Sequence, residues 1–390
     1  MAPGPVLSFL PGKEVHRKDP EGRGGWPPLA ISGPLMDKRE RVKAALAGRP
    51  VDRVPVGFWG HDFLREWTPQ GLADAMVESV QRYDIDYLKV NPRATYYAEA
   101  WGCRYRPSGD PALGPETEAW VLKSADELGS IRPLDIGGGP FGEQLEALRL
   151  IGHRLAGETP FIQTVFSPLS VLGRLANGDL SAVRGYMRDA SSALHGALAA
   201  IAETLARYTA ACLEAGADGI FFATVDWGTF DNCSREQYAE FGRPYDMRVL
   251  KVARGGSFNV LHVCRQNNML VDLLDYPVQA FNWAAALPGN PSLAEVLSKT
   301  DKAVMGGLNE RTTLLKGSPS EVQGEARAAL AETAGRRPDG RPSGRFLLAP
   351  GCSISPQTPE ANLRAAVGVA REWTAGARSG TSRGGKEASR

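Results

Sequence analysis

The strongest constraint on the fold is a repeated alternation of short apolar runs and longer amphipathic segments along the 390-residue chain. Short apolar runs bounded by loop residues are typical of buried strands, and the longer segments are typical of crossover helices, most clearly over residues 192–214. Eight such units predict an α/β fold, a (β/α)8 TIM barrel, with its active site at the carboxyl ends of the strands. The expected strands are Val54–Trp59, Tyr87–Asn91, Phe161–Phe166, Gly219–Thr224, Phe258–Cys264, Ala280–Ala284, Ala303–Leu308 and Phe346–Ala349.

A single domain accounts for this length, and we expect the barrel to span residues 36–375. The first 34 residues hold 13 Gly and Pro, so residues 1–35 are predicted to be a disordered extension. The basic, Gly/Ser-rich segment 376–390 is predicted to be a disordered tail. A helix begins abruptly near Met36, which suggests the hypothesis that Met36 is the true start. Segment 102–160 is longer than one crossover helix needs and predicts an excursion between the second and third strands.

Charge balance and cysteine usage exclude several classes of protein. The chain has 45 Lys and Arg against 44 Asp and Glu, a formal net charge of +1, which gives no electrostatic footprint for nucleic acid. Five cysteines without framework spacing argue against a secreted disulfide scaffold and for a reducing cytoplasm. No apolar run approaches the roughly 20 residues that span a bilayer. We expect a cytoplasmic protein that binds neither nucleic acid nor membrane, and its oligomeric state stays open.

Two short stretches carry residues suited to metal chemistry: Leu261-His262-Val263-Cys264 and Ala349-Pro350-Gly351-Cys352. Residues i and i+2 of a strand point to the same face, so His262 and Cys264 face one point, and Cys352 arrives from a second strand. One imidazole and two thiolates form a three-ligand zinc set that leaves the fourth position open. Any one of these residues would more commonly be an ordinary core residue. The three together at strand ends predict a metal site.

Further motifs follow one another between residues 36 and 374. They are Glu40-Arg41-Val42 to Ala47, Val51-Asp52-Arg53-Val54-Pro55-Val56, Gly216-Ala217-Asp218-Gly219-Ile220, Tyr238 to Pro244-Tyr245, and Gly351-Cys352 through Pro359-Glu360-Ala361-Asn362-Leu363. In content and order they resemble the uroporphyrinogen decarboxylase superfamily. The resemblance implies a (β/α)8 barrel, in agreement with the strand pattern. It also implies one of two activities: decarboxylation of uroporphyrinogen, or zinc-dependent methyl transfer between corrinoid proteins and thiols.

Residues at the expected barrel mouth favour the methyltransferase branch. The decarboxylases hold a polycarboxylate partly with an arginine-rich loop after the first strand, typically Arg-Gln-Ala-Gly-Arg. This chain has Gly57 to Asp62 there, and its first arginine is Arg65, so the bidentate carboxylate partners are missing. The decarboxylases usually carry Gly-His-Gly where this chain has Gly351-Cys352-Ser353. The methyltransferase branch carries His-x-Cys and a distant Cys, as this chain does.

We therefore expect a zinc-dependent methyltransferase that moves a methyl group from a corrinoid, or another activated donor, to a thiol or similar small acceptor. Zinc is the expected cofactor, with a corrinoid as methyl donor or partner cofactor and a corrinoid protein as a candidate partner. Two alternatives stay open. One is a cofactor-free decarboxylase of uroporphyrinogen or another tetrapyrrole, and the other is a non-catalytic corrinoid-binding barrel.

Other residues near the expected strand ends are further candidates. Asp226 and Glu310, just past the fourth and seventh strands, are the acidic candidates for acid–base catalysis or a fourth zinc ligand, with solvated loop carboxylates as the alternative. Lys89, Asn91 and Arg93 run toward the end of the second strand, and Arg93 is placed to bind an anionic substrate or to form a rim salt bridge. Pocket walls and rim packing use the same residue types. The substrate-binding candidates besides Arg93 are Phe166, Ser167, Trp227, Asn282 and Trp283.

Overall fold

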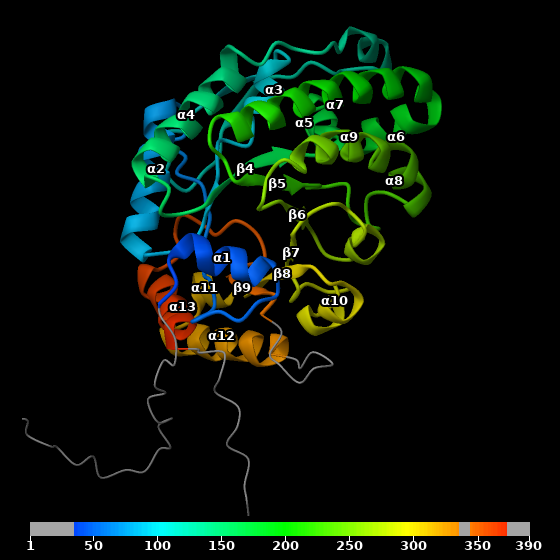
Figure 1. The fold of residues 1–390 in the computed structure, drawn as a ribbon. Coiled ribbons are helices and arrows are strands. Elements are labelled where there is room, and N and C mark those ends of the chain that lie inside the picture. The colour runs from blue at the N-terminus through cyan, green and yellow to red at the C-terminus, as the bar shows by residue number, and fades with distance from the viewer. Residues whose placement is uncertain (1–34, 335–343, 373–390) are drawn as a thin grey trace, which may run out of the picture.

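A curled parallel sheet forms the centre of the molecule, and helices cover its outside (Figure 1). The computed structural model describes residues 35–334 and 344–372, so the predicted extensions lie outside the described residues apart from Leu35. The seven strands of the sheet follow chain order, and every neighbouring pair is parallel. The strands are β1 Leu88–Val90, β4 Phe161–Phe166, β5 Gly219–Ala223, β6 Val260–Val263, β7 Ala280–Trp283, β8 Ala303–Leu308 and β9 Phe346–Pro350.

The segment 54–60 closes the barrel between β9 and β1. On one side, the Leu348 N–H donates to the Pro55 carbonyl at 2.9 Å. On the other side, the Asp86 N–H donates to the Val56 carbonyl at 2.8 Å. The regular strand predicted over Val54–Trp59 is wrong: the segment forms isolated bridges instead, and Pro55 has no N–H with which to extend a ladder. Because the segment still fills the eighth position, the predicted (β/α)8 architecture is confirmed.

Helices connect the strands on the outside of the barrel. Several begin at a side chain that accepts a first-turn N–H, as at Ser167, Asp179 and Ser318. No helix in the described part of the chain is long and apolar enough to cross a membrane. The helices are α1 Lys38–Leu46, α2 Pro69–Tyr83, α3 Tyr96–Ala100, α4 Gly139–Leu155, α5 Pro168–Leu175, α6 Leu180–Asp189, α7 Ser191–Glu214, α8 Arg235–Phe241, α9 Arg243–Ala253, η2 Leu270–Leu273, α10 Leu293–Lys299, α11 Thr313–Lys316, α12 Pro319–Thr333 and α13 Glu360–Glu372.

The excursion predicted within segment 102–160 is present. After α3 the chain forms an antiparallel pair, β2 Arg104–Arg106 and β3 Glu116–Ala119, which is separate from the barrel sheet. A short 3-10 helix, η1 Ala125–Ser130, follows, and then α4 leads into β4. The helix predicted over residues 192–214 is also present, as α7, with its apolar side buried. With 24 residues, α7 is the longest helix among the described residues.

A buried ion-pair network lies beneath the closing segment, at the amino-terminal end of the strands. Arg41 donates to Asp52 and to Asp86, each at 2.7 Å, and Arg53 donates to Asp86 at 2.6 Å. The Asp86 carboxylate also accepts the Val56 N–H at 3.0 Å. Since the side chains of Arg41, Asp52 and Asp86 are at most 5% exposed, these bonds hold the segment 54–60 against the start of β1.

Candidate metal centre

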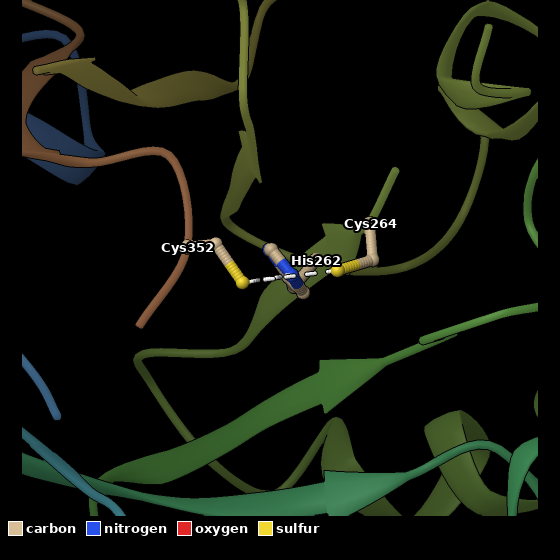
Figure 2. A group of neighbouring side chains, drawn as sticks. All are labelled: His262, Cys264 and Cys352. Carbon is tan, nitrogen blue, oxygen red and sulfur yellow. Dashed lines mark hydrogen bonds between the residues drawn. The ribbon is translucent and has the colours of Figure 1, made fainter. Parts of the chain in front are cut away.

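The three predicted ligands lie together at the carboxyl end of the barrel. His262 is the third residue of β6, Cys264 follows β6, and Cys352 lies two residues past the end of β9. Figure 2 shows the three side chains close together, with hydrogen bonds drawn between them. The sulfurs of Cys264 and Cys352 are 3.7 Å apart, and Cys352 Sγ is 3.8 Å from His262 Nε2. Their ligand atoms all lie within 4.8 Å of one another, which is compact enough for one ion to contact all three.

The spacing of the ligand atoms fits a tetrahedral zinc site. Two sulfurs bound at about 2.3 Å to a tetrahedral zinc lie about 3.8 Å apart, and a sulfur and an imidazole nitrogen about 3.6 Å apart. The two separations from Cys352 Sγ, 3.7 and 3.8 Å, agree with these values, and the Cys264 and His262 ligand atoms lie within 4.8 Å of each other. A disulfide would need the sulfurs at about 2.05 Å, and both cysteines are free. The donor set and its geometry therefore suit zinc with one position left for a further ligand.

Asn282 on β7 determines which nitrogen of the neutral His262 ring carries the proton. Its amide nitrogen donates to the carbonyls of Met305 (3.0 Å) and Pro350 (3.1 Å), so its oxygen must be the atom facing His262 Nδ1 at 2.6 Å. An acceptor at that distance requires a proton on Nδ1. The neutral ring then carries its lone pair on Nε2, the atom next to Cys352. A residue predicted to bind substrate thus orients a metal ligand in this structure.

A hydrogen bond couples the two thiols of Cys264 and Cys352. The Cys264 thiol donates to Cys352, and this bond, helped by the neighbouring His262, lowers the pKa of Cys352 well below its ordinary value. The same bond, together with burial, raises the pKa of Cys264. A bound metal would ionise both thiols, because a coordinated thiol loses its proton.

Beneath the ligands lies an aromatic and cationic layer inside the barrel. The Phe221 ring from β5 stacks on His262 with centroids 5.1 Å apart, and Trp59 packs on Phe221 at 5.3 Å. The Lys89 ammonium from β1 lies 4.9 Å from the Phe221 centroid. Burial lowers the pKa of Lys89 to about 7, although the charges of Cys352, Cys264 and Glu66 act to raise it. The site therefore contains a lysine whose pKa lies close to neutral pH.

Glu310, a predicted acid–base candidate, lies just past β8. Its side chain is 5% exposed, and burial raises its pKa, with the charge of Cys352 acting in the same direction. A cavity of about 210 Å³ beside it is also lined by Trp283 and Gly351. Among the described residues, the metal-ligand group holds neither Glu310 nor Asp226. The charge of Cys352 thus acts on Glu310, and the role of Glu310 stays a prediction.

Asp226, the second acid–base candidate, forms an ion pair with Arg265, the residue after Cys264. The Arg265 Nε donates to the Asp226 carboxylate at 2.8 Å. Arg265 has φ +72°, a left-handed conformation that non-glycine residues rarely adopt. The chain therefore turns sharply directly after the ligand, and the ion pair stabilises that turn. A catalytic role for Asp226 stays a prediction.

The remaining substrate-binding candidates are buried in contacts with the protein. Arg93 donates to Glu99 and Glu143, at 2.8 Å in each case, which is the rim salt bridge that the sequence allowed as an alternative. Trp283 donates through Nε1 to the Pro291 carbonyl at 2.9 Å. Their roles toward a substrate stay predictions.

Three more of these candidates meet around α5. Phe166 ends β4 and stacks on Tyr97 with centroids 4.9 Å apart. Ser167 caps α5 by accepting the Ser170 N–H at 3.2 Å. Trp227 is 1% exposed and packs on Gly173, where an added Cβ would lie 2.9 Å from the indole nitrogen. The structure thus places these three in the packing between strand ends and α5.

Two further residues of the site had little sequence signal. Lys89 is the one charged residue in the run Leu88–Val90, and an isolated charge in an apolar strand was the available clue. Glu66 lies in the loop after the closing segment, among several other charged residues, so nothing in its local pattern marks it. Both are buried in the structure.

Fold and site together define a (β/α)8-barrel protein with a candidate His-Cys-Cys metal centre at the carboxyl end of its strands. The chain belongs to the uroporphyrinogen decarboxylase (URO-D) family, whose profile matches residues 37–373. This confirms the resemblance that the sequence motifs indicated.

Relatives with known names divide between two activities. The methylcobamide:CoM methyltransferase MtaA of Methanosarcina barkeri is 25% identical, over 86% of this chain and 98% of its own length. MtbA of Methanosarcina acetivorans, also a methylcobamide:CoM methyltransferase, is 24% identical over the same shares. The uroporphyrinogen decarboxylase of Carboxydothermus hydrogenoformans is 25% identical over 78% of this chain and 83% of its own length. A methyltransferase structure from Methanosarcina mazei has the same fold, with a TM-score of 0.73, 23% identity, and coverage of 86% of this chain and 99% of that one.

Proposed function

We propose that this protein is a zinc-dependent methyltransferase that moves a methyl group from a methylated corrinoid to a thiol. The observation that carries the proposal is the ligand geometry: two sulfurs 3.7 Å apart, with an imidazole nitrogen 3.8 Å from one of them. The similarity to methylcobamide:CoM methyltransferases over 98% of their length supports the same reading.

His262, Cys264 and Cys352 would hold the zinc. When bound there, zinc supplies a positive charge that lowers the pKa of an incoming thiol and keeps it as the thiolate. The chain's own residues prepare that position. Asn282 keeps the His262 lone pair on Nε2, and the Phe221 ring packed on the imidazole excludes water from its other side. Cys264 and Cys352 are only half-buried, which leaves a path for the thiol and for the proton that it releases.

The proposed methyl transfer from corrinoid to thiol balances in atoms and electrons. The thiol loses its proton to solvent, a sulfur–carbon bond forms, and the cobalt–carbon bond of the methyl donor breaks with both electrons left on cobalt. The thiol is the expected small acceptor, and a corrinoid protein is the expected partner. A thiol acceptor and a corrinoid donor are also what the names of the relatives describe.

A tetrapyrrole decarboxylase is the weaker candidate, because such an enzyme needs free cations for a polycarboxylate. Within residues 35–334 and 344–372, the two arginines nearest the mouth loop already bind protein carboxylates. Arg65 pairs with Asp62 and Glu78, and Arg93 is held by acidic partners from two elements. The arrangement offers no paired guanidinium groups at segment 57–62.

The test is zinc-loaded protein mixed with methylcobalamin, or with a methylated corrinoid protein, and a panel of thiols, with loss of the methyl–cobalt absorbance as the readout. We expect zinc-dependent demethylation that the Cys264→Ala variant abolishes. The Cys212→Ala variant is the matched control, because Cys212 is buried inside α7 and is no part of the ligand group. Robust uroporphyrinogen decarboxylation without demethylation by any corrinoid would overturn the proposal.

A further inference from the structure

A group of buried polar side chains without sufficient partners lies on the β1 side of the barrel interior. It consists of Lys89, Asn91 and Glu66, which are 4%, 3% and 1% exposed. The Glu66 carboxylate binds His61 Nδ1 at 2.8 Å through one oxygen, and its other oxygen has no partner. The Asn91 amide nitrogen also has no partner. We call these three residues the Lys89 cluster.

The Lys89 ammonium itself is under-satisfied. Its hydrogen bond goes to the Asn91 amide oxygen, which is neutral, and in the described part of the chain no carboxylate forms an ion pair with it. Since Asn91 gives its oxygen to Lys89, its unpartnered N–H groups are the donors that remain. A buried ammonium and a buried amide nitrogen therefore offer donors side by side. Burying such groups without an acceptor is costly.

The cluster faces the metal centre. The Phe221 ring contacts both groups: the Lys89 ammonium lies 4.9 Å from its centroid, and the His262 imidazole stacks on it at 5.1 Å. The charges of Cys264 and Cys352 act on the Lys89 ammonium, and so does that of Glu66. Glu66 is thus near Lys89 without forming an ion pair with it. Donors of Lys89 and Asn91 and a free oxygen of Glu66 thus lie within the electrostatic reach of the two thiols.

We propose that the Lys89 cluster is the recognition site for the polar end of the acceptor, and that the acceptor is an amino-acid thiol carrying both a carboxylate and an ammonium group. This inference rests on the proposed function, because it names the class of thiol that the site takes. Lys89 and Asn91 donate to the carboxylate, and the free oxygen of Glu66 accepts from the ammonium. The thiol end of the same molecule then points to Cys264 and Cys352. Each charged group of the acceptor meets a complementary buried group that has hydrogen-bonding capacity left.

The experiment compares thiols that differ by one charged group. Calorimetry on the zinc-loaded full chain measures the affinity of cysteine, of 3-mercaptopropionate, which lacks the amine, and of cysteamine, which lacks the carboxylate. The homologous series one methylene longer is measured in parallel. In at least one series we expect the zwitterion to bind on the order of ten- to a hundredfold more tightly than either analogue, the range expected for one charge-assisted hydrogen-bonded pair.

Two variants separate the roles of the charges. Lys89→Met should remove the preference for the carboxylate and keep the preference for the amine, and Glu66→Gln should do the opposite. Lys302→Met is the matched control, because Lys302 also lies over a phenylalanine ring, at 5.3 Å from the Phe281 centroid, and donates to backbone carbonyls far from the ligands. It should change neither preference. A general loss of packing would lower all affinities together and could not produce these opposite changes.

Three results would overturn the inference: equal affinity of the wild-type protein for the three thiols in both series, parallel loss of both preferences in both variants, or the same loss in Lys302→Met. The first needs no variant and so does not depend on any substituted chain folding. Demethylation of methylcobalamin with the uncharged 2-mercaptoethanol separates the two proposals. If that reaction proceeds while no charge preference exists, the methyltransferase function stands and the Lys89 cluster has no role in recognition.

Discussion

Replacing Asn282 by leucine should weaken metal binding through the orientation of His262. The substitution removes three hydrogen bonds: one that His262 Nδ1 donates to the Asn282 oxygen, and two that the Asn282 amide nitrogen donates to the carbonyls of Met305 and Pro350. At a net contribution of about 1 kcal/mol each, the free energy of unfolding should fall by about 3 kcal/mol. Without its acceptor the Nδ1 proton is no longer fixed, so the ring can carry its proton on Nε2 or rotate. Loss of such an orienting partner weakens metal binding roughly 10- to 100-fold.

The assay is zinc affinity by competition with a chromophoric chelator, with unfolding measured in parallel. Asn259→Leu is the matched control, since Asn259 is equally buried and also forms three hydrogen bonds, to the Ala253 and Gly256 carbonyls and from the Ile220 N–H. It should cost similar stability and leave zinc affinity unchanged. An Asn282→Leu protein that binds zinc as tightly as the control would refute the proposed tautomer and its role.

Two further predictions concern packing and pH. Gly351→Ala should lower stability by about 1–3 kcal/mol and weaken zinc binding by displacing Cys352, because an added Cβ would lie 2.5 Å from the Ala284 Cα. Thermal unfolding measures the change in stability, and zinc titration measures the change in affinity. Gly324→Ala, where nothing lies within 4 Å, should do neither. For Asp52, burial acts to raise the pKa, but hydrogen bonds and charge from the neighbouring arginine hold it below its ordinary value of 3.8. The ionised Asp52 therefore stabilises the fold above that value, and this stabilisation is lost as the pH falls through the lower folded-state pKa. Asp52→Asn should lower the free energy of unfolding by roughly 2–4 kcal/mol near pH 7. Between about pH 5 and 3, urea unfolding should show a smaller further loss of stability in Asp52→Asn than in the wild-type protein.

Much of the fold could be predicted because apolar runs in this chain coincide with buried strands. Phe161–Phe166 and Ala303–Leu308 have the predicted bounds. The closing segment could not be predicted in detail, since the missing N–H of Pro55 limits its pairing while its apolar pattern still resembles a strand. The ladder of β6 ends at Val263, before the predicted Cys264, because the chain turns at Arg265.

For the site, the two-residue period of a strand was enough to place His262 and Cys264 on one face. The role of Asn282 was beyond prediction, because its three partners come from β6, β8 and the end of β9. The pairing of Arg93 with Glu143, 50 residues away, was likewise invisible in the local pattern. Residue types and strand ends can be recognised from the sequence, but partnerships across the barrel depend on tertiary structure.

The central claim is that His262, Cys264 and Cys352 hold one zinc ion with a position free for a thiol. Zinc K-edge X-ray absorption of the purified protein, before and after addition of a thiol, tests it directly. We expect two sulfurs at about 2.3 Å and one imidazole nitrogen at about 2.0–2.1 Å in the resting protein, and a third sulfur after the thiol is added. A protein that retains no zinc, a zinc shell without sulfur, or a shell that the thiol leaves unchanged would contradict the account.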